Sequence, residues 1–146
     1  MRFSFLPCIY KLLIAEKNLD FVIETDACEL LAHEWMLREL SRNLLHNAIH
    51  FSPLNGQLTV QLKQQDDVIE LLIQDQGGGI SDELMQRLCQ PFSSGNIRSG
   101  SGLGLSICQE ICRSLLGRLE FKNIQNNKAV KGLLVKAIIP AKPITN

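Results

Sequence analysis

The segment from Asn43 to Phe51, with the apolar residues before it, constrains this chain more than any other stretch. Its apolar residues recur at the three- and four-residue spacing of an amphipathic helix, which predicts one helix over residues 34–51. Asn43 and Asn47 lie four residues apart and therefore share one face of that helix. Taken alone, the two amides fit either a ligand site at the edge of the apolar stripe or a solvent-exposed helix flank.

Asparagine offers a neutral, hard carbonyl oxygen. Such an oxygen suits Mg²⁺ that is held mainly by the phosphates of a nucleotide, because this ion otherwise keeps its waters. The two amides therefore raise the hypothesis of a magnesium and nucleotide site on this helix.

The bulk properties indicate one domain, residues 1–146, in which we expect residues 1–10 to be a disordered or truncated leader. The formal net charge is zero and no run of Lys and Arg exceeds two residues, so the sequence does not support a nucleic-acid-binding surface. The five cysteines are irregularly spaced, which fits neither a disulfide framework nor a zinc site and favours a reducing compartment. Cys108 and Cys112, one helical turn apart, are expected to be small core residues. No stretch approaches the ~20 apolar residues of a membrane span.

The hydrophobic patterns predict strands that arrive mostly in hairpins. That order gives an α/β (α+β) two-layer sandwich, in which helices cover one face of a mixed, mostly antiparallel sheet. The strand at residues 68–74 is apolar on both faces and should be more central than its partner at residues 57–63. The other predicted elements are helices at residues 6–18, 81–88 (N-cap Ser81) and 103–116 (C-cap Gly117), and strands at residues 19–24, 28–31, 118–124 and 132–139, the last two joined by a turn at residues 125–128.

Asp75 stands at the end of the more central strand, where a carboxylate needs a donor. Gly77 and Gly79 follow it and would let the backbone approach a flat ligand closely. A carboxylate that accepts from an exocyclic amino group would select adenine over guanine. The alternative is a simple Asp-Gly turn that ends the strand.

A second glycine cluster, at residues 100, 102 and 104, precedes a predicted helix. Free amides and the positive end of a helix can bind phosphate oxygens there. The spacing is not that of a P-loop, and no suitable lysine follows. A flexible turn remains the alternative for this cluster by itself.

The order of these motifs is more specific than any one of them. An Asn-bearing helix, D-x-G-x-G-I, Pro-Phe and G-x-G-L-G-L follow one another within about 65 residues. This order closely resembles the ATP-binding catalytic domain of sensor histidine kinases, in the superfamily (Bergerat-type fold) that includes gyrase, the large heat-shock chaperone and mismatch-repair ATPases. The resemblance covers roughly residues 12–140.

The resemblance implies roles for individual residues. Asn47 would be the Mg²⁺ ligand, Asn43 a second polar contact to phosphate or metal, and Asp75 the acceptor for the adenine amino group. Residues 93–99 would form the ATP lid, with Arg98 as its cation. The remaining implied ATP contacts are His50, Phe51, Gly77, Gly79, Ile80, Phe92, Gly100, Ser101, Gly102, Leu103, Gly104 and Leu105.

The chain also departs from the family pattern. His50 and Phe51 stand where family members often carry Lys or Arg and then Tyr, so phosphate attraction should be weaker near pH 7, unless His50 hydrogen-bonds a phosphate or a water. His33 precedes the long helix as a poor cap, and we do not expect it to be the phosphoacceptor, because the motif that follows such a histidine is missing.

The resemblance implies a histidine protein kinase that transfers the γ-phosphate of Mg-ATP to a histidine on a separate dimerisation domain, for relay to a response regulator. We expect that domain to be absent from this chain, the chain to be monomeric and inactive in autophosphorylation, and the parent to be a homodimer anchored in the bacterial inner membrane with this domain in the cytoplasm. The alternatives are a superfamily ATPase, which Asn43 disfavours because an amide cannot accept a proton, and a degenerate nucleotide-sensing scaffold.

Overall fold

The computed structural model describes residues 8–26, 28, 30, 32–89 and 100–141. Their elements follow the order in which the patterns along the chain change from helical to alternating. These elements are α1 (Cys8–Glu16), β1 (Asp20–Thr25), α2 (Glu34–Phe51), β2 (Gln57–Gln65), β3 (Val68–Gln74), α3 (Asp82–Cys89), α4 (Gly100–Ser114), β4 (Arg118–Asn126) and β5 (Ala129–Pro140).

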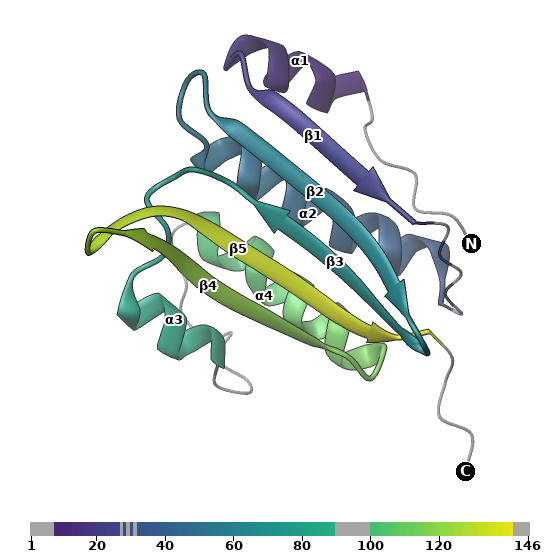
Figure 1. The fold of residues 1–146 in the computed structure, drawn as a ribbon. Coiled ribbons are helices and arrows are strands. Elements are labelled where there is room, and N and C mark those ends of the chain that lie inside the picture. Colours follow the sequence, from purple (N-terminus) through teal and green to yellow (C-terminus); the bar gives the residue numbers. More distant parts are fainter. Residues whose placement is uncertain (1–7, 27, 29, 31, 90–99, 142–146) are drawn as a thin grey trace.

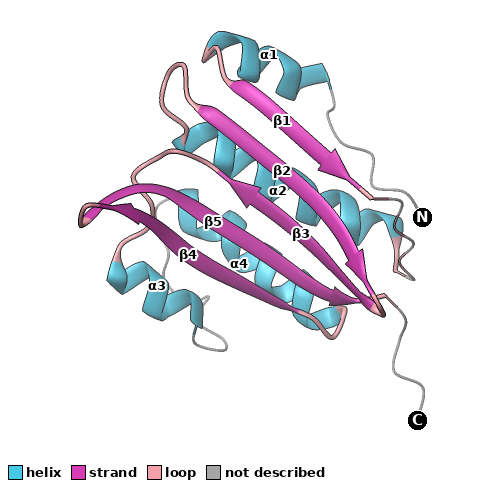
Figure 2. Cartoon of the chain, viewed as in Figure 1, coloured by secondary structure: helices cyan, strands magenta, loops and turns pink. Residues whose placement is uncertain are grey.

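The strands form one five-stranded sheet in the order β1-β2-β3-β5-β4. Only β1 and β2 pair in parallel, and the other three pairs are antiparallel. Helices α2 and α4 lie on the same face of this sheet, as Figure 1 and the colouring of Figure 2 show. The predicted fold class is therefore confirmed, and β3 is the central strand, as predicted.

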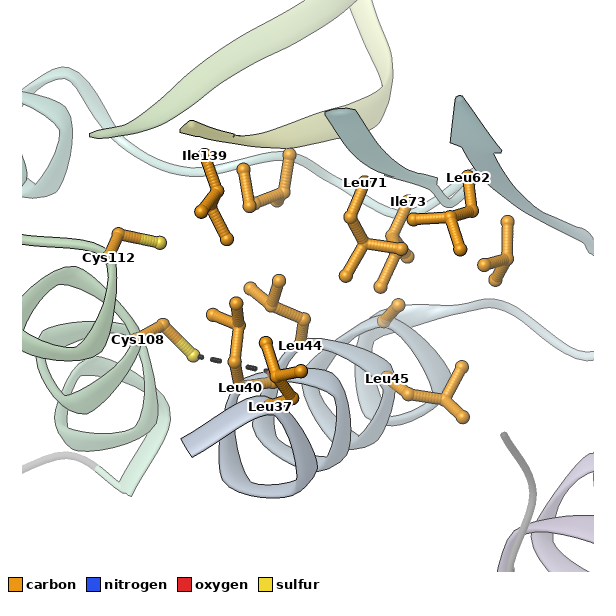
Figure 3. Close-up of a cluster of buried hydrophobic side chains, with 14 of the residues drawn as sticks. Leu37, Leu40, Leu44, Leu45, Leu62, Leu71, Ile73, Cys108, Cys112 and Ile139 are labelled. Carbon is orange, nitrogen blue, oxygen red and sulfur yellow. Dashed lines mark hydrogen bonds between the residues drawn. The ribbon is translucent and has the colours of Figure 1, made fainter. Parts of the chain in front are cut away.

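The core lies between the sheet and the helices α2 and α4. Leu40 of α2, Leu71 of β3 and Ile139 of β5 are almost completely buried and face one another across this layer (Figure 3). Burying one such side chain contributes roughly 1.5–3 kcal/mol. Cys108 and Cys112 of α4 are buried in the same cluster, which confirms that they are core residues.

Several predicted boundaries agree with the structure. The helix at Glu34–Phe51 and the strand at Val68–Gln74 have the predicted ends. Ser81 caps α3, because its Oγ accepts a hydrogen bond of 3.1 Å from the Leu84 amide. His33 makes no side-chain cap bond to α2, as expected of a poor cap.

Other predictions need correction. The strand predicted at residues 28–31 is not seen at its described residues: Cys28 and Leu30 are buried, but neither belongs to a strand. Helix α4 begins at Gly100 and not at residue 103, so Gly100 and Gly102 lie in its first turn and Gly104 directly follows that turn. Strand β5 begins at Ala129, before the predicted residue 132, because the turn of the hairpin is only two residues long, Asn127 and Lys128, with φ of 51° and 68°.

The C-cap of α4 was predicted one residue too late. Leu116 has the left-handed φ of 62°, and its amide bonds to the Arg113 carbonyl at 3.0 Å. The Gly117 amide reaches the Cys112 carbonyl at 2.8 Å, which completes a Schellman motif with Leu116 as its left-handed residue. Gly117 is required for another reason, since a Cβ there would collide with the Ile138 carbonyl oxygen of β5.

No helix among the described residues has both the length and the apolar character needed to cross a membrane.

Candidate functional site

One pocket lies between α2, the end of β3, the start of α4 and β5. It holds about 340 Å³ of open space, including solvent at its mouth. Of the ten described residues that line it, eight are apolar, which suits a flat apolar ligand oriented by a few polar groups. The lining residues are Leu44, Asn47, Ala48, Phe51, Ile73, Asp75, Ile80, Leu105, Leu133 and Val135.

Asp75 is the buried acid of this pocket, with only 3% of its surface exposed. Its Oδ1 accepts hydrogen bonds from the backbone amides of Gly77 at 2.8 Å and Leu133 at 3.3 Å. Burial raises the pKa of Asp75 above its ordinary value, against the lowering effect of these two amides. Neither bond uses Oδ2, so this oxygen can accept from a donor in the pocket.

The loop after Asp75 is held at several points. The Gln76 Oε1 accepts from the Gln57 amide at 2.7 Å. Gly79 has a φ of 74°, which turns the chain back toward β4. Ile80, which lines the pocket, is bound through its backbone to the side chain of Asn123. The loop is therefore fixed from β2, β4 and β5 as well as from its own strand.

Asn43 and Asn47 meet the start of α4. A Cβ placed on Gly104 would lie 3.2 Å from Asn47 Nδ2 and 3.6 Å from Asn43 Oδ1, so the helix backbone passes directly over both amides. Asn43 Nδ2 donates to the Glu39 carbonyl at 2.8 Å, which orients its amide. Asn47 Nδ2 is buried and has no hydrogen-bond partner among the described residues. An unpaired buried donor is costly, and a ligand at this point would relieve that cost.

Of the other predicted site residues, some line the pocket, one does not, and some lie outside the described residues. Phe51 and Leu105 line the pocket, and 39% of Phe51 is exposed. His50 is exposed, does not line the pocket, and stacks on His46 with ring centroids 6.5 Å apart. Phe92, Arg98 and the predicted lid at residues 93–99 lie outside the described residues.

Because α4 begins at Gly100, phosphate would be bound by the first turn of the helix and not by a loop before it. Gly100, Ser101, Gly102 and Leu103 are the first four residues of the helix and not a loop before it. The first four amides of a helix have no partner within it and carry its partial positive charge. The backbone of the first turn is therefore the anion-binding part of this cluster.

Sequence reasoning missed Lys17, which follows α1. Its Nζ donates to the carbonyls of Ile49 at 2.8 Å, His50 at 2.7 Å and Ser52 at 2.8 Å, and so caps the C-terminal end of α2. It also missed Asn123. The contacts of Lys17 and Asn123 join segments more than 30 residues apart, so no local sequence pattern could predict them.

Comparison with known proteins agrees with the resemblance in the sequence. Residues 32–142 match the family described as "Histidine kinase-, DNA gyrase B-, and HSP90-like ATPase". The chain is 29% identical over 123 residues to the sensor protein CreC of Escherichia coli, and 28% identical over 130 residues to sporulation kinase C of Bacillus subtilis. These matches cover 82% and 89% of this chain, but only 26% and 28% of the two relatives.

Solved structures give the same result. The catalytic domain of histidine kinase ThkA superposes with a TM-score of 0.78 at 27% identity, covering 92% of this chain and 88% of that one. The mycobacterial sensor histidine kinase MprB gives 0.73 at 25% identity, covering 92% and 91%.

Proposed function

The chain belongs to the histidine kinase-, DNA gyrase B- and HSP90-like ATPase family, and from that premise we propose that it is the ATP-binding catalytic domain of a sensor histidine kinase. It binds Mg-ATP and transfers the γ-phosphate to a histidine on a separate dimerisation domain. The chain spans about a quarter of the length of the curated relatives CreC and sporulation kinase C, and we propose the activity for a longer parent protein.

The observation that carries the proposal is the continuity of the site. At one end, Asp75 Oδ2 and an apolar pocket suit the adenine amino group and ring. At the other end, Asn43 and Asn47 lie against α4 at Gly104, directly after the first turn of that helix, whose free amides suit phosphate. An adenine nucleotide is a flat ring joined to phosphates, and it would span the two ends.

The donor set of the second end fits Mg²⁺. The Oδ1 atoms of Asn43 and Asn47 both lie 3.6 Å from the Cβ position of Gly104 and are the atoms that could ligate the ion. The buried Nδ2 of Asn47, which has no partner among the described residues, could instead donate to a phosphate oxygen. Among the described residues no group of three His, Cys, Asp or Glu side chains could hold a metal by itself. Amides alone therefore suit an ion that the nucleotide phosphates bring with them. When bound, Mg²⁺ neutralises phosphate charge and aligns the γ-phosphate for transfer.

Asn43 favours transfer over hydrolysis. In the ATPases of this superfamily an acid at this position activates water, as the resemblance implies, and an amide cannot accept the proton. The amide of Asn43 instead donates to Glu39 and keeps its oxygen toward the site.

The partners follow from the same proposal. ThkA has been solved in complex with the response regulator TrrA, and we propose a response regulator as the downstream partner of the parent of this chain. We further propose that the parent is a homodimer anchored in the inner membrane, with this domain in the cytoplasm, because relatives such as CreC are named sensor proteins.

Labelling of the parent protein tests the proposal. With γ-labelled ATP and Mg²⁺, acid-labile phosphohistidine should form, and Asn47→Ala should lower its rate at least about 100-fold, as expected for loss of a positioning contact. Asn126→Ala, an exposed asparagine of β4, is the matched control and should leave the rate unchanged. A parent that binds ATP without labelling would be a nucleotide sensor, and an active Asn47→Ala variant would remove Asn47 from the site.

A further inference from the structure

We propose that Asn123 is a positioning residue for the nucleotide pocket and acts through the backbone of Ile80. Asn123 Oδ1 accepts a hydrogen bond from the Ile80 amide at 2.9 Å, and Asn123 Nδ2 donates to the Ile80 carbonyl at 2.8 Å. One side-chain amide thus pairs with both polar backbone groups of one residue, as a neighbouring strand would. Because Ile80 lines the pocket, this contact links edge strand β4 to the ligand site.

The position of Asn123 in β4 makes this pairing specific. Leu119 and Phe121 precede it at alternate positions and pack against the core, so Asn123 points to the same, helix-covered face of the sheet. A polar side chain on that face is costly unless it is fully hydrogen-bonded. Ile80, 43 residues earlier in the chain, supplies both partners.

The contact closes the loop that carries the adenine-binding groups. Asp75 anchors the start of that loop through the Gly77 and Leu133 amides, and Asn123 anchors its end. Gly79 lies so close that a Cβ on it would collide with Asn123 Oδ1. With both ends fixed, the loop is preorganised, so the nucleotide does not have to order it on binding.

Asn123→Leu tests the contact in this chain. It keeps the approximate size of the side chain and leaves the Ile80 amide and carbonyl unpaired. The Ile80 amide should exchange faster with solvent in the absence of nucleotide, and the Kd for ATP should rise about tenfold, as for loss of one to two hydrogen bonds. Asn126→Leu, three residues further along the same strand, is the matched control and should change neither quantity.

Asn123→Asp separates positioning from a merely structural role. A carboxylate still accepts from the Ile80 amide but repels the Ile80 carbonyl, whereas a protonated carboxyl supplies both an acceptor and a donor. The ratio of the variant and wild-type Kd values for ATP, each taken at the same pH, should therefore approach one as the pH is lowered. Taking the ratio at each pH cancels the titration of Asp75 and of the nucleotide, which affects both proteins equally. Asn126→Asp should show no such trend.

The proposal rests on the proposed function only for its effect on ATP. Unchanged Ile80 exchange in Asn123→Leu would overturn it, as would faster exchange with an unchanged Kd for ATP. If the wild-type chain bound no ATP while Ile80 exchange still depended on Asn123, the proposed function would fail and the contact would stand as a structural one.

Discussion

At the scale of single residues, the charge of Asp75 lowers the stability of the fold, and under the proposed function the same charge favours nucleotide binding. Its pKa is raised in the folded chain by burial. A carboxyl with a higher pKa in the folded than in the unfolded chain destabilises the fold when ionised. This cost is absent below the unfolded pKa of about 3.9 and is fully present above the raised folded pKa.

Asp75→Asn should therefore raise the melting temperature of the nucleotide-free chain at neutral pH. The amide keeps an Oδ1 acceptor for Gly77 and Leu133 and removes the buried charge. The same change should weaken ATP binding by at least about 1.5–3 kcal/mol, because with Oδ1 held by the two backbone amides the atom that replaces Oδ2 is Nδ2, a donor that cannot accept from the adenine amino group. Thermal unfolding from pH 3 to 8 measures the first effect, and the stabilisation should disappear near the acid end. A variant that is less stable than wild type at pH 7 would contradict the account of Asp75.

Lys17 offers a second prediction at this scale. Its ammonium group donates to three carbonyls at the negative end of α2, where the Ile49 carbonyl also accepts from the Ser52 amide at 3.3 Å. Lys17→Met keeps the length of the apolar stem and should destabilise the chain by roughly 1–2 kcal/mol. Lys11→Met, on the exposed side of α1, is the control and should have almost no effect. Equal midpoints of urea unfolding for the two variants would show that the cap contributes nothing.

At the scale of elements, the C-cap of α4 leads to a prediction opposite to the one that the sequence alone suggests, because the sequence favours Gly117 as the left-handed residue. Leu116 has a left-handed φ of 62°, and 61% of it is exposed. Burial of its side chain therefore offsets little of the backbone strain. Leu116→Gly should stabilise the chain by about 0.5–1 kcal/mol. Gly117→Ala should destabilise it, because the new Cβ would collide with the Ile138 carbonyl. Calorimetry of both variants decides the matter: the opposite order of stabilities would restore Gly117 as the left-handed residue.

The two elements with the strongest patterns were predicted with correct ends. Helix α2 has a continuous apolar stripe and a proline after its last turn, and β3 lies between two turn-forming segments. The cap of α4 was predicted wrongly because glycine is usually the left-handed residue, whereas here the approach of β5 to Gly117 determines where glycine is needed.

The residues of the candidate site also fall into those that the sequence could predict and those that it could not. Asn43, Asn47, Asp75 and the glycine clusters belong to short motifs and could be found in the sequence. Lys17 and Asn123 could not, because their partners become neighbours only when the sheet and helices assemble. Spacing along the sequence predicts which groups could contact a ligand. Tertiary packing determines which other residues hold those groups in place.

At the scale of the whole molecule, this chain should bind nucleotide without labelling itself. His33 lies at the start of α2, and His46 and His50 lie on it, so all three move with the helix that carries Asn43 and Asn47. None of them is among the described residues that line the pocket, so we expect none to take the place of an acceptor histidine on a separate domain. After incubation with γ-labelled ATP we expect no acid-labile phosphate on the chain, and label on any of these histidines would show that the acceptor lies within it.

The central claim is that Asp75 and the pocket around it select an adenine nucleotide. A carboxylate accepts from the adenine amino group but repels the oxygen that guanine presents at the same place, so ATP and ADP should bind at least about tenfold more tightly than GTP, a difference of about 1.4 kcal/mol. Isothermal titration calorimetry of the wild-type chain with Mg-ATP, Mg-ADP and Mg-GTP measures this directly. We expect a clear preference for both adenine nucleotides, and an equal Kd for GTP would show that Asp75 does not select adenine.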